Sequence, residues 1–287
     1  MSSGEGRKTR VLSDIFGAPP LSVLDPKQKY WKVKKKEWLG KGIESELGRG
    51  ENALKLSTLL QKKQKGTSIF DPFLVELIVR WYSKEGDVVF DPFAGGSVRG
   101  VVTSTLGRTY VGYELREEQV QANNLQKNIS EHPNLVEWVY ADSAVKEPPA
   151  CQLVFTCPPY LDLEKYSQHP NDLSNMGVED FFQVYETILS KAVEKLAENC
   201  FLVIMVGNVR KDGVLICFPE RTVNILLKLG LSYHNELIYL QEPATAAMRA
   251  YNAMNISRVA GSIHQKLYVF CKGSSKDCAT RLGKFMD

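Results

Sequence analysis

Apolar positions along the chain follow two alternating patterns from residue 73 onward. Short runs of β-branched and other apolar residues predict buried strands, and between them apolar residues recur at a helical spacing. The predicted strands cover 87–90, 109–114, 136–141, 152–156, 201–206, 231–240 and 266–272. The predicted helices cover 73–83, 97–106, 116–129, 178–197 and 219–229. This alternation predicts an α/β domain in which helices cover both faces of a mostly parallel, seven-stranded sheet.

The C-terminal part of the pattern differs from the rest. The last two predicted strands have no helical pattern between them, so they predict an antiparallel hairpin at the C-terminal edge of the sheet. The residues that join them, 241–263, predict a long polar loop. A loop of this length in a compact domain is often functional.

The N-terminal part has no such alternation. Residues 1–25 contain Gly, Ser and a Pro-Pro step, which predict a loosely ordered arm. The basic residues that follow predict a partly helical segment with Trp31 and Trp38 as apolar anchors. The sequence therefore predicts an N-terminal region, 1–66, and a main domain, 67–287.

Charge is unevenly distributed over a chain whose net charge is only +3. Residues 27–65 contain twelve Lys and Arg against four Glu, a net charge of +8, which leaves −5 for the rest. Such a segment suits a polyanionic partner, with Lys34, Lys35 and Lys36 as candidate contacts, or it is a solvated lysine-rich helix. Charge alone leaves both interpretations open.

Composition excludes several classes of protein. No apolar run approaches the length of a membrane span, and the N-terminus lacks the apolar core of a secretory signal. The six cysteines form no Cys-x-x-Cys pair, which favours buried free thiols in a reducing compartment. We therefore expect a cytoplasmic protein with no membrane partner.

The first candidate ligand site follows the strand predicted at 87–90. Asp91 is followed by a turn, 92–96, that contains two consecutive glycines, and glycines let a backbone turn tightly and approach a ligand closely. Ligands of open parallel sheets bind at the carboxyl ends of the strands. Glu114 and Asp142 follow the next two strands, and a carboxylate in such a place can accept ribose hydroxyls.

The second candidate site is the turn after the strand predicted at 152–156. Its residues are Cys157, Pro158, Pro159 and Tyr160. Prolines stiffen the turn and fix the direction of the carbonyl between them, and a tyrosine offers a face on which a planar ring can stack. Fixed carbonyl acceptors can assist attack by an amine that is a poor nucleophile.

Taken together, these motifs resemble those of class I S-adenosylmethionine-dependent DNA amino methyltransferases of the bacterial or phage type, over roughly residues 20–273. The resemblance implies a Rossmann-like fold and methylation of the exocyclic amine of a flipped base in double-stranded DNA, at cytosine N4 or adenine N6. It implies a catalytic role for 157–160. The cofactor-binding residues that it implies are Phe70, Asp71, Pro72, Asp91, Pro92, Phe93, Ala94, Gly95, Gly96, Glu114, Leu115, Asp142 and Ser143.

Cys157 departs from the family, which usually has Asp, Asn or Ser at this position. A thiol is a weak acceptor, so the Pro158 carbonyl takes a larger share of the expected work. Because Cys is closest in size to Ser, which is commoner in enzymes that make N4-methylcytosine, N4-cytosine is slightly favoured over N6-adenine. A nucleophilic thiol, as in cytosine C5 methyltransferases, is disfavoured because there the cysteine follows the proline.

The polar segments 161–175 and 241–263 flank the expected site, and Arg249 and Arg258 are candidate contacts to base edges or phosphates. Two alternatives stay open: an RNA or protein-amide methyltransferase of the same fold, and a non-catalytic nucleic-acid-binding member. Monomer and homodimer stay open as well. The expected compartment is the cytoplasm of a bacterial cell or of a phage-infected host.

Overall fold

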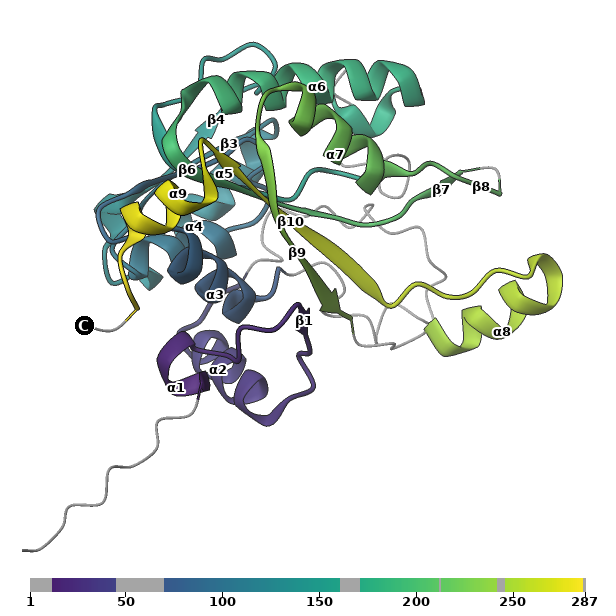
Figure 1. Cartoon of the computed structure of the whole chain (residues 1–287), viewed down its shortest axis with the longest axis horizontal. Helices are drawn as coiled ribbons and strands as arrows, with labels where there is room; N and C mark the ends of the chain where they lie inside the picture. The colour runs from purple at the N-terminus through teal and green to yellow at the C-terminus, as the bar shows by residue number, and fades with distance from the viewer. Residues whose placement is uncertain (1–11, 45–69, 161–170, 212, 242–245, 286–287) are drawn as a thin grey trace, which may run out of the picture.

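The computed structural model describes residues 12–44, 70–160, 171–211, 213–241 and 246–285. Its main sheet has eight strands in the order β1-β9-β10-β6-β5-β2-β3-β4, and β7 and β8 form a separate two-stranded sheet (Figure 1). The strands of the main sheet are β1 (Val23–Leu24), β2 (Val88–Asp91), β3 (Thr109–Glu114), β4 (Val136–Tyr140), β5 (Cys151–Thr156), β6 (Leu196–Val206), β9 (Ser232–Leu240) and β10 (His264–Lys272).

Strands β4, β3, β2, β5 and β6 pair in parallel, whereas β10 runs antiparallel to both of its neighbours, β6 and β9. This confirms the predicted α/β class with a mostly parallel sheet and an antiparallel C-terminal pair. One detail of the prediction is wrong, because the sheet has an eighth strand, β1, which pairs in parallel with β9 at the outer side of the hairpin.

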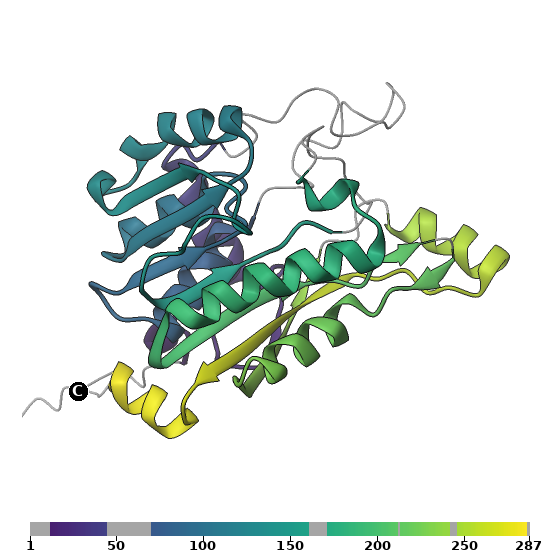
Figure 2. The same cartoon turned by 90° about the horizontal axis from the view of Figure 1, so that it is seen from above.

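Helices cover both faces of the sheet (Figure 2). The helices are α1 (Leu12–Phe16), α2 (Lys29–Gly40), α3 (Pro72–Tyr82), α4 (Val98–Thr105), α5 (Glu117–Leu125), α6 (Val178–Lys195), α7 (Phe218–Lys228), α8 (Ala246–Ser257) and α9 (Ser275–Leu282), with short 3-10 turns at Lys127–Ile129, Pro133–Leu135 and Leu173–Asn175. Helices α3 and α4 pack into one hydrophobic core and α6 and α7 into another. The sheet separates the two cores.

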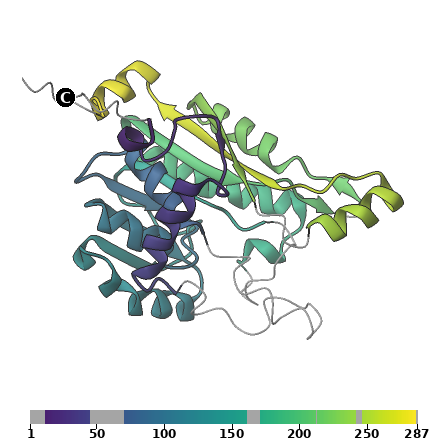
Figure 3. The same cartoon turned by 90° about the horizontal axis from the view of Figure 1, so that it is seen from below.

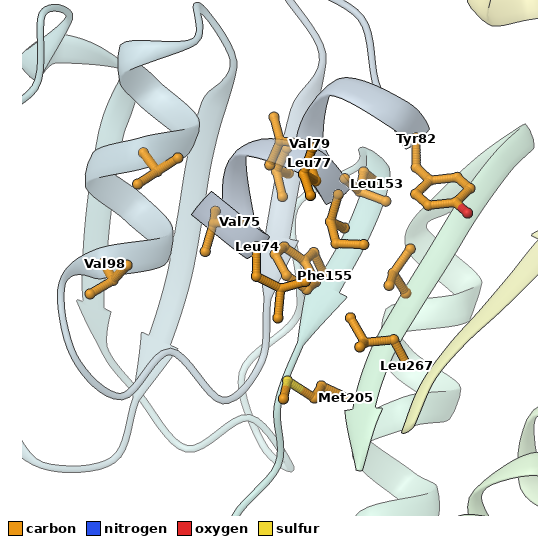
Figure 4. Packing of buried hydrophobic residues seen from close by; sticks show 14 of the residues in the cluster. Leu74, Val75, Leu77, Val79, Tyr82, Val98, Leu153, Phe155, Met205 and Leu267 are labelled. Atoms are coloured by element: carbon orange, nitrogen blue, oxygen red, sulfur yellow. The ribbon is translucent and has the colours of Figure 1, made fainter. Parts of the chain in front are cut away.

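The central strands show why this sheet is buried on both sides. Along β6, Phe201, Val203 and Met205 face the core under α3, and the alternate residues face the core under α6. Period-two alternation sends successive side chains to opposite faces, so an uninterrupted apolar run is what a doubly covered strand requires. Figure 4 shows the first of these cores, in which α3 packs on Phe155 of β5 and Leu267 of β10.

The prediction of a loosely ordered arm over 1–25 is wrong for the part that the structure describes. Helix α1 and strand β1 lie in it, and Ala18 and Leu24 are buried in the same core as α3. The arm is ordered because β1 pairs with β9. Trp31 and Trp38 of α2 are buried against this core, which confirms their role as anchors. The predicted boundary after residue 66 lies outside the described residues.

The prediction of a polar loop over 241–263 is also wrong, because helix α8 occupies most of it. Helix α8 contains four alanines and two methionines, which have high helix propensity. Helix α8 projects away from the sheet, as Figure 1, Figure 2 and Figure 3 all show. Among the residues that the structure describes, no helix is long and apolar enough to cross a membrane.

Candidate active site

The two predicted turns lie on neighbouring strand tips. Strands β2 and β5 pair in parallel, with Phe90 opposite Val154, so the turn after Asp91 and the turn after Thr156 leave the same edge of the sheet. A hydrogen bond of 2.6 Å from Thr156 Oγ1 to Asp91 Oδ1 joins the two strand ends directly. The glycine turn and the proline turn therefore lie side by side.

Asp91 is completely buried and accepts hydrogen bonds on both carboxylate oxygens. Oδ1 accepts from Thr156 and from the Phe93 backbone N–H at 3.1 Å, and Oδ2 accepts from Arg99 Nε at 2.6 Å and Tyr110 Oη at 2.8 Å. These donors compensate for burying the charge. The carboxylate is directed into the protein, so its effect on a ligand acts through the shape of the turn.

Arg99, on α4, holds the outer side of the same turn. Its guanidinium donates to the carbonyls of Phe93 and Ala94, at 2.7 and 3.0 Å, and lies 4.8 Å from the centre of the Phe70 ring. Burial alone lowers the pKa of Arg99, but the charge and hydrogen bond of Asp91, together with Tyr110 and Cys157, raise the pKa above its ordinary value. Sequence reasoning missed this residue, although a lone arginine inside an apolar helix was a usable signal.

Backbone contacts fix the glycine turn against β3. Ala94 N–H donates to the Tyr113 carbonyl at 3.0 Å, and Gly95 donates to Glu114 Oε2 at 3.0 Å. The Gly95 carbonyl accepts from Asn123 Nδ2 at 2.7 Å. Gly95 has φ +54°, in the left-handed region that favours glycine. The turn is therefore held on both sides before any ligand binds.

The residues around Gly95 fit the nucleoside part of S-adenosylmethionine. An added Cβ at Gly95 would meet no atom within 4 Å, so open space lies over this turn. Glu114 stands beside it with its carboxylate largely buried, and burial raises its pKa even though Arg116 nearby acts in the opposite direction. A carboxylate next to a glycine turn at a strand tip is the arrangement that binds ribose hydroxyls in nucleotide-binding sheets.

The third strand tip joins the same site through Ser143. Ser143 Oγ donates to the Pro92 carbonyl at 2.6 Å, while Asp142 accepts from Ala144 N–H at 2.8 Å and Asn171 Nδ2 at 2.9 Å. The structure therefore brings the strand ends of β2, β3 and β4 together, with Gly96 and Leu115 half-buried between them. The assignment of these residues to cofactor binding stays a prediction.

The upstream motif, 70–72, forms the start of α3. Asp71 is the N-cap and accepts from the Phe73 N–H at 3.0 Å, with Pro72 in the first turn of the helix. Its other oxygen accepts from Trp31 Nε1 at 3.2 Å, Tyr239 Oη at 3.0 Å and Lys35 Nζ at 3.0 Å. One buried carboxylate thus joins α2, α3 and β9, and a role of these residues in cofactor binding stays a prediction.

The proline turn presents Tyr160 at the end of β5. Pro158 is buried, whereas Cys157, Pro159 and Tyr160 are half-buried. Tyr160 Oη accepts from Gln265 Nε2 at 2.8 Å, and its ring packs edge-on against Phe218 with 6.1 Å between ring centres. Sequence reasoning missed Gln265, which lies on β10. These contacts hold the tyrosine ring from two sides.

Cys157 is held as a neutral thiol. Burial raises its pKa, an effect that Arg99 reduces without removing, and its Sγ lies 4.0 Å from Tyr160 Oη. Because the thiolate is the nucleophilic form of cysteine, a raised pKa disfavours attack by this residue. The role of the Pro158 carbonyl as the main acceptor stays a prediction.

The structure does not gather the predicted nucleic-acid contacts at one place. Lys34 forms an ion pair of 2.8 Å with Glu37, Lys35 pairs with the buried Asp71, and Lys36 is exposed. Arg258 is exposed just after α8. Arg249 lies within α8, and the orientation of its side chain is outside the described residues, as is the polar segment 161–170.

Known proteins share parts of this arrangement. Residues 20–125 match the DNA methylase family. A stretch of 49 residues, 17% of this chain, is 39% identical to the Type II methyltransferase M2.DpnII of Streptococcus pneumoniae and covers 18% of that protein. A stretch of 88 residues, 30% of this chain, is 33% identical to the orphan methyltransferase M.BamHII of Bacillus amyloliquefaciens and covers 33% of it. The chain therefore aligns with a third or less of the length of these relatives.

The fold also matches a solved structure. The (4+2)-cyclase SpnF superposes with a TM-score of 0.51 at 12% sequence identity, over 74% of this chain and 86% of that one. Together with the strand order of the sheet, this likeness confirms the predicted Rossmann-like α/β fold with a mostly parallel sheet.

Proposed function

We propose that the protein is a site-specific DNA methyltransferase, because residues 20–125 match the DNA methylase family. It moves a methyl group from S-adenosylmethionine to the exocyclic amine of a base in double-stranded DNA, in the cytoplasm of a bacterium or of a phage-infected host. The observation that supports this most directly is the pairing of β2 with β5, which sets the glycine turn beside Tyr160 and its proline turn.

The glycine turn would bind the cofactor, and the proline turn would position the base. When bound, S-adenosylmethionine supplies an electrophilic methyl group, and Glu114 and the turn at 94–96 would hold its nucleoside part. The Pro158 carbonyl accepts a hydrogen bond from the amine and keeps its lone pair directed toward the cofactor pocket. Tyr160 stacks on the extruded base, so that most of the rate enhancement comes from positioning. N4 of cytosine is slightly favoured over N6 of adenine.

Product analysis tests this proposal. The protein is incubated with labelled S-adenosylmethionine and, separately, with unmethylated duplex DNA, tRNA and a protein mixture. We expect label in DNA alone, and digestion to nucleosides followed by mass spectrometry should give N4-methylcytosine or N6-methyladenine. Label in tRNA or protein would contradict the DNA assignment. Cofactor binding by calorimetry without any transfer would favour the non-catalytic alternative.

Helix α2 is proposed as a contact to the DNA backbone, together with Arg249 and Arg258. Lys35 holds Asp71, so the variant that spares the fold is Lys34→Glu with Lys36→Glu. We expect weaker DNA binding and a salt dependence whose slope falls by about one for each lost phosphate contact. Titration of a labelled duplex at several salt concentrations measures both quantities.

Lys276→Glu is the matched control for this pair. Lys276 is exposed on α9, which follows β10 and therefore lies at the opposite edge of the sheet from the two turns. Its reversal should leave the slope unchanged. An unchanged slope in the α2 variant as well would show that α2 is a solvated lysine-rich helix.

A further inference from the structure

A small hairpin extends from the edge of the sheet where the site lies. It consists of β7 (Arg210–Lys211) and β8 (Val214–Leu215), which pair with each other and with no strand of the main sheet. Figure 1 shows it reaching outward beyond β6 and α7. Val214 is 65% exposed and Leu215 is 40% exposed. These two side chains give the projecting hairpin an exposed apolar strand that is available to a partner.

Both ends of the hairpin are fixed beside Tyr160. On the entry side, a Cβ added to Gly207 would lie 3.5 Å from the Tyr160 ring. On the exit side, the ring of buried Phe218 packs against the same tyrosine. A backbone hydrogen bond of 2.9 Å from Ile216 N–H to the Val209 carbonyl joins the two ends of the hairpin where it leaves the rest of the protein. Since three residues span at most about 10 Å, β7 begins within that distance of Gly207, which itself lies beside the Tyr160 ring.

The hairpin also carries the charge that a polyanion requires. Arg210 is exposed, and its Nη1 donates to the Gly213 carbonyl at 2.6 Å, which keeps its guanidinium at the hairpin. Lys211 follows it on the same strand. Basic residues on one strand and apolar residues on the strand beside it are the combination with which proteins bind a DNA backbone and insert side chains between bases.

We propose that this hairpin is the element that separates the target base from its neighbours. Building on the proposed function, Val214 enters the duplex and fills the space that the extruded base leaves, while Arg210 contacts a phosphate. Filling this space offsets the loss of stacking, which is the main cost of moving a base out of a duplex. The hairpin thus stabilises the duplex that the base has left, and Tyr160 stabilises the extruded base.

The test compares two substrates with one enzyme. A duplex that wild-type protein methylates is first identified by sequencing methylated plasmid DNA. Two oligonucleotides are then made, one with the target base paired and one with it opposite an abasic site. Val214→Ser with Leu215→Ser should lower the methylation rate of the paired duplex by about tenfold or more, and that of the unpaired target by about twofold or less, because only the first needs help with extrusion.

A fluorescent base at the target position gives an independent readout. 2-Aminopurine brightens when it is unstacked, so its signal on mixing with protein should fall in the double variant and not in the control, Leu227→Ser. Leu227 is 46% exposed on α7, which makes it similar in exposure to Leu215.

The outcomes separate the hairpin from the activity. An equal loss of rate on both substrates would contradict the insertion of the hairpin into the duplex and assign these residues to the catalytic site or to folding. No loss on either substrate would overturn it too, and a change in oligomeric state in that case would point to contact with a second copy of the chain. If wild-type protein methylates no DNA, the proposed function is wrong, and the proposed role of the hairpin is wrong with it.

Discussion

Tyr160→Ala lowers turnover by about 10- to 100-fold and leaves the affinity for S-adenosylmethionine within about threefold, since stacking of a base on an aromatic ring contributes about 1–3 kcal/mol. The ring is available for this role because Gln265 and Phe218 hold it at the end of β5. Steady-state methylation measures the first quantity, and calorimetry with the cofactor measures the second.

Two companion variants separate the ring from its hydroxyl group. Tyr160→Phe keeps the face and loses the hydrogen bond from Gln265, so its turnover should fall by less than about tenfold, which corresponds to one ordinary hydrogen bond. Gln265→Leu should match it, and the two changes combined should cost no more than either alone. If Tyr160→Ala weakened cofactor binding as strongly as it lowered turnover, the tyrosine would have a structural role and not a stacking role.

Asp91→Ala abolishes measurable cofactor binding and lowers the free energy of unfolding by about 3–5 kcal/mol, the usual cost of leaving one member of a buried ion pair alone. The variant leaves Arg99 buried without its carboxylate and removes the acceptor of Tyr110 and Thr156. The glycine turn then loses the carboxylate that supports it. A displacement of about 1 Å in such a site lowers the reaction rate on the order of 100-fold. Urea denaturation and calorimetry measure the two effects.

The same strand provides a matched control. Asp87 lies at the other end of β2, where its carboxylate pairs with Arg281 of α9. Asp87→Ala should also lower stability, but it should keep the cofactor affinity of the wild type because it does not touch the turn. If Asp91→Ala retained micromolar affinity, the proposed pocket would be in the wrong place.

Local pattern was enough to predict most of the sheet and the position of both turns. The strand predicted at 109–114 is observed with the same bounds as β3, and helix 73–83 differs from α3 by one residue at each end. These elements were predictable because burial on both faces requires continuous apolar runs in strands and one apolar stripe in each helix. Proline and glycine then mark the turns by their backbone geometry.

Contacts between distant parts of the chain could not be predicted in this way. Gln265 reaches Tyr160 across 105 positions, and Tyr239 reaches Asp71 across 168, because β10 is inserted between β6 and β9. No periodicity in a single sequence specifies which polar side chains such an insertion brings together. Helix α8 was missed for a different reason, since a helix that projects into solvent has no buried face to reveal it.

The carboxylate of Asp71 has a consequence for how the molecule unfolds. Its donors come from α2, from α3 and from β9, and β9 in turn carries β1 at its edge. The N-terminal elements therefore cannot open as an independent unit while the sheet stays intact, because their release strands a buried charge at the start of α3. Helix α2, helix α3 and strand β9 are therefore expected to unfold together.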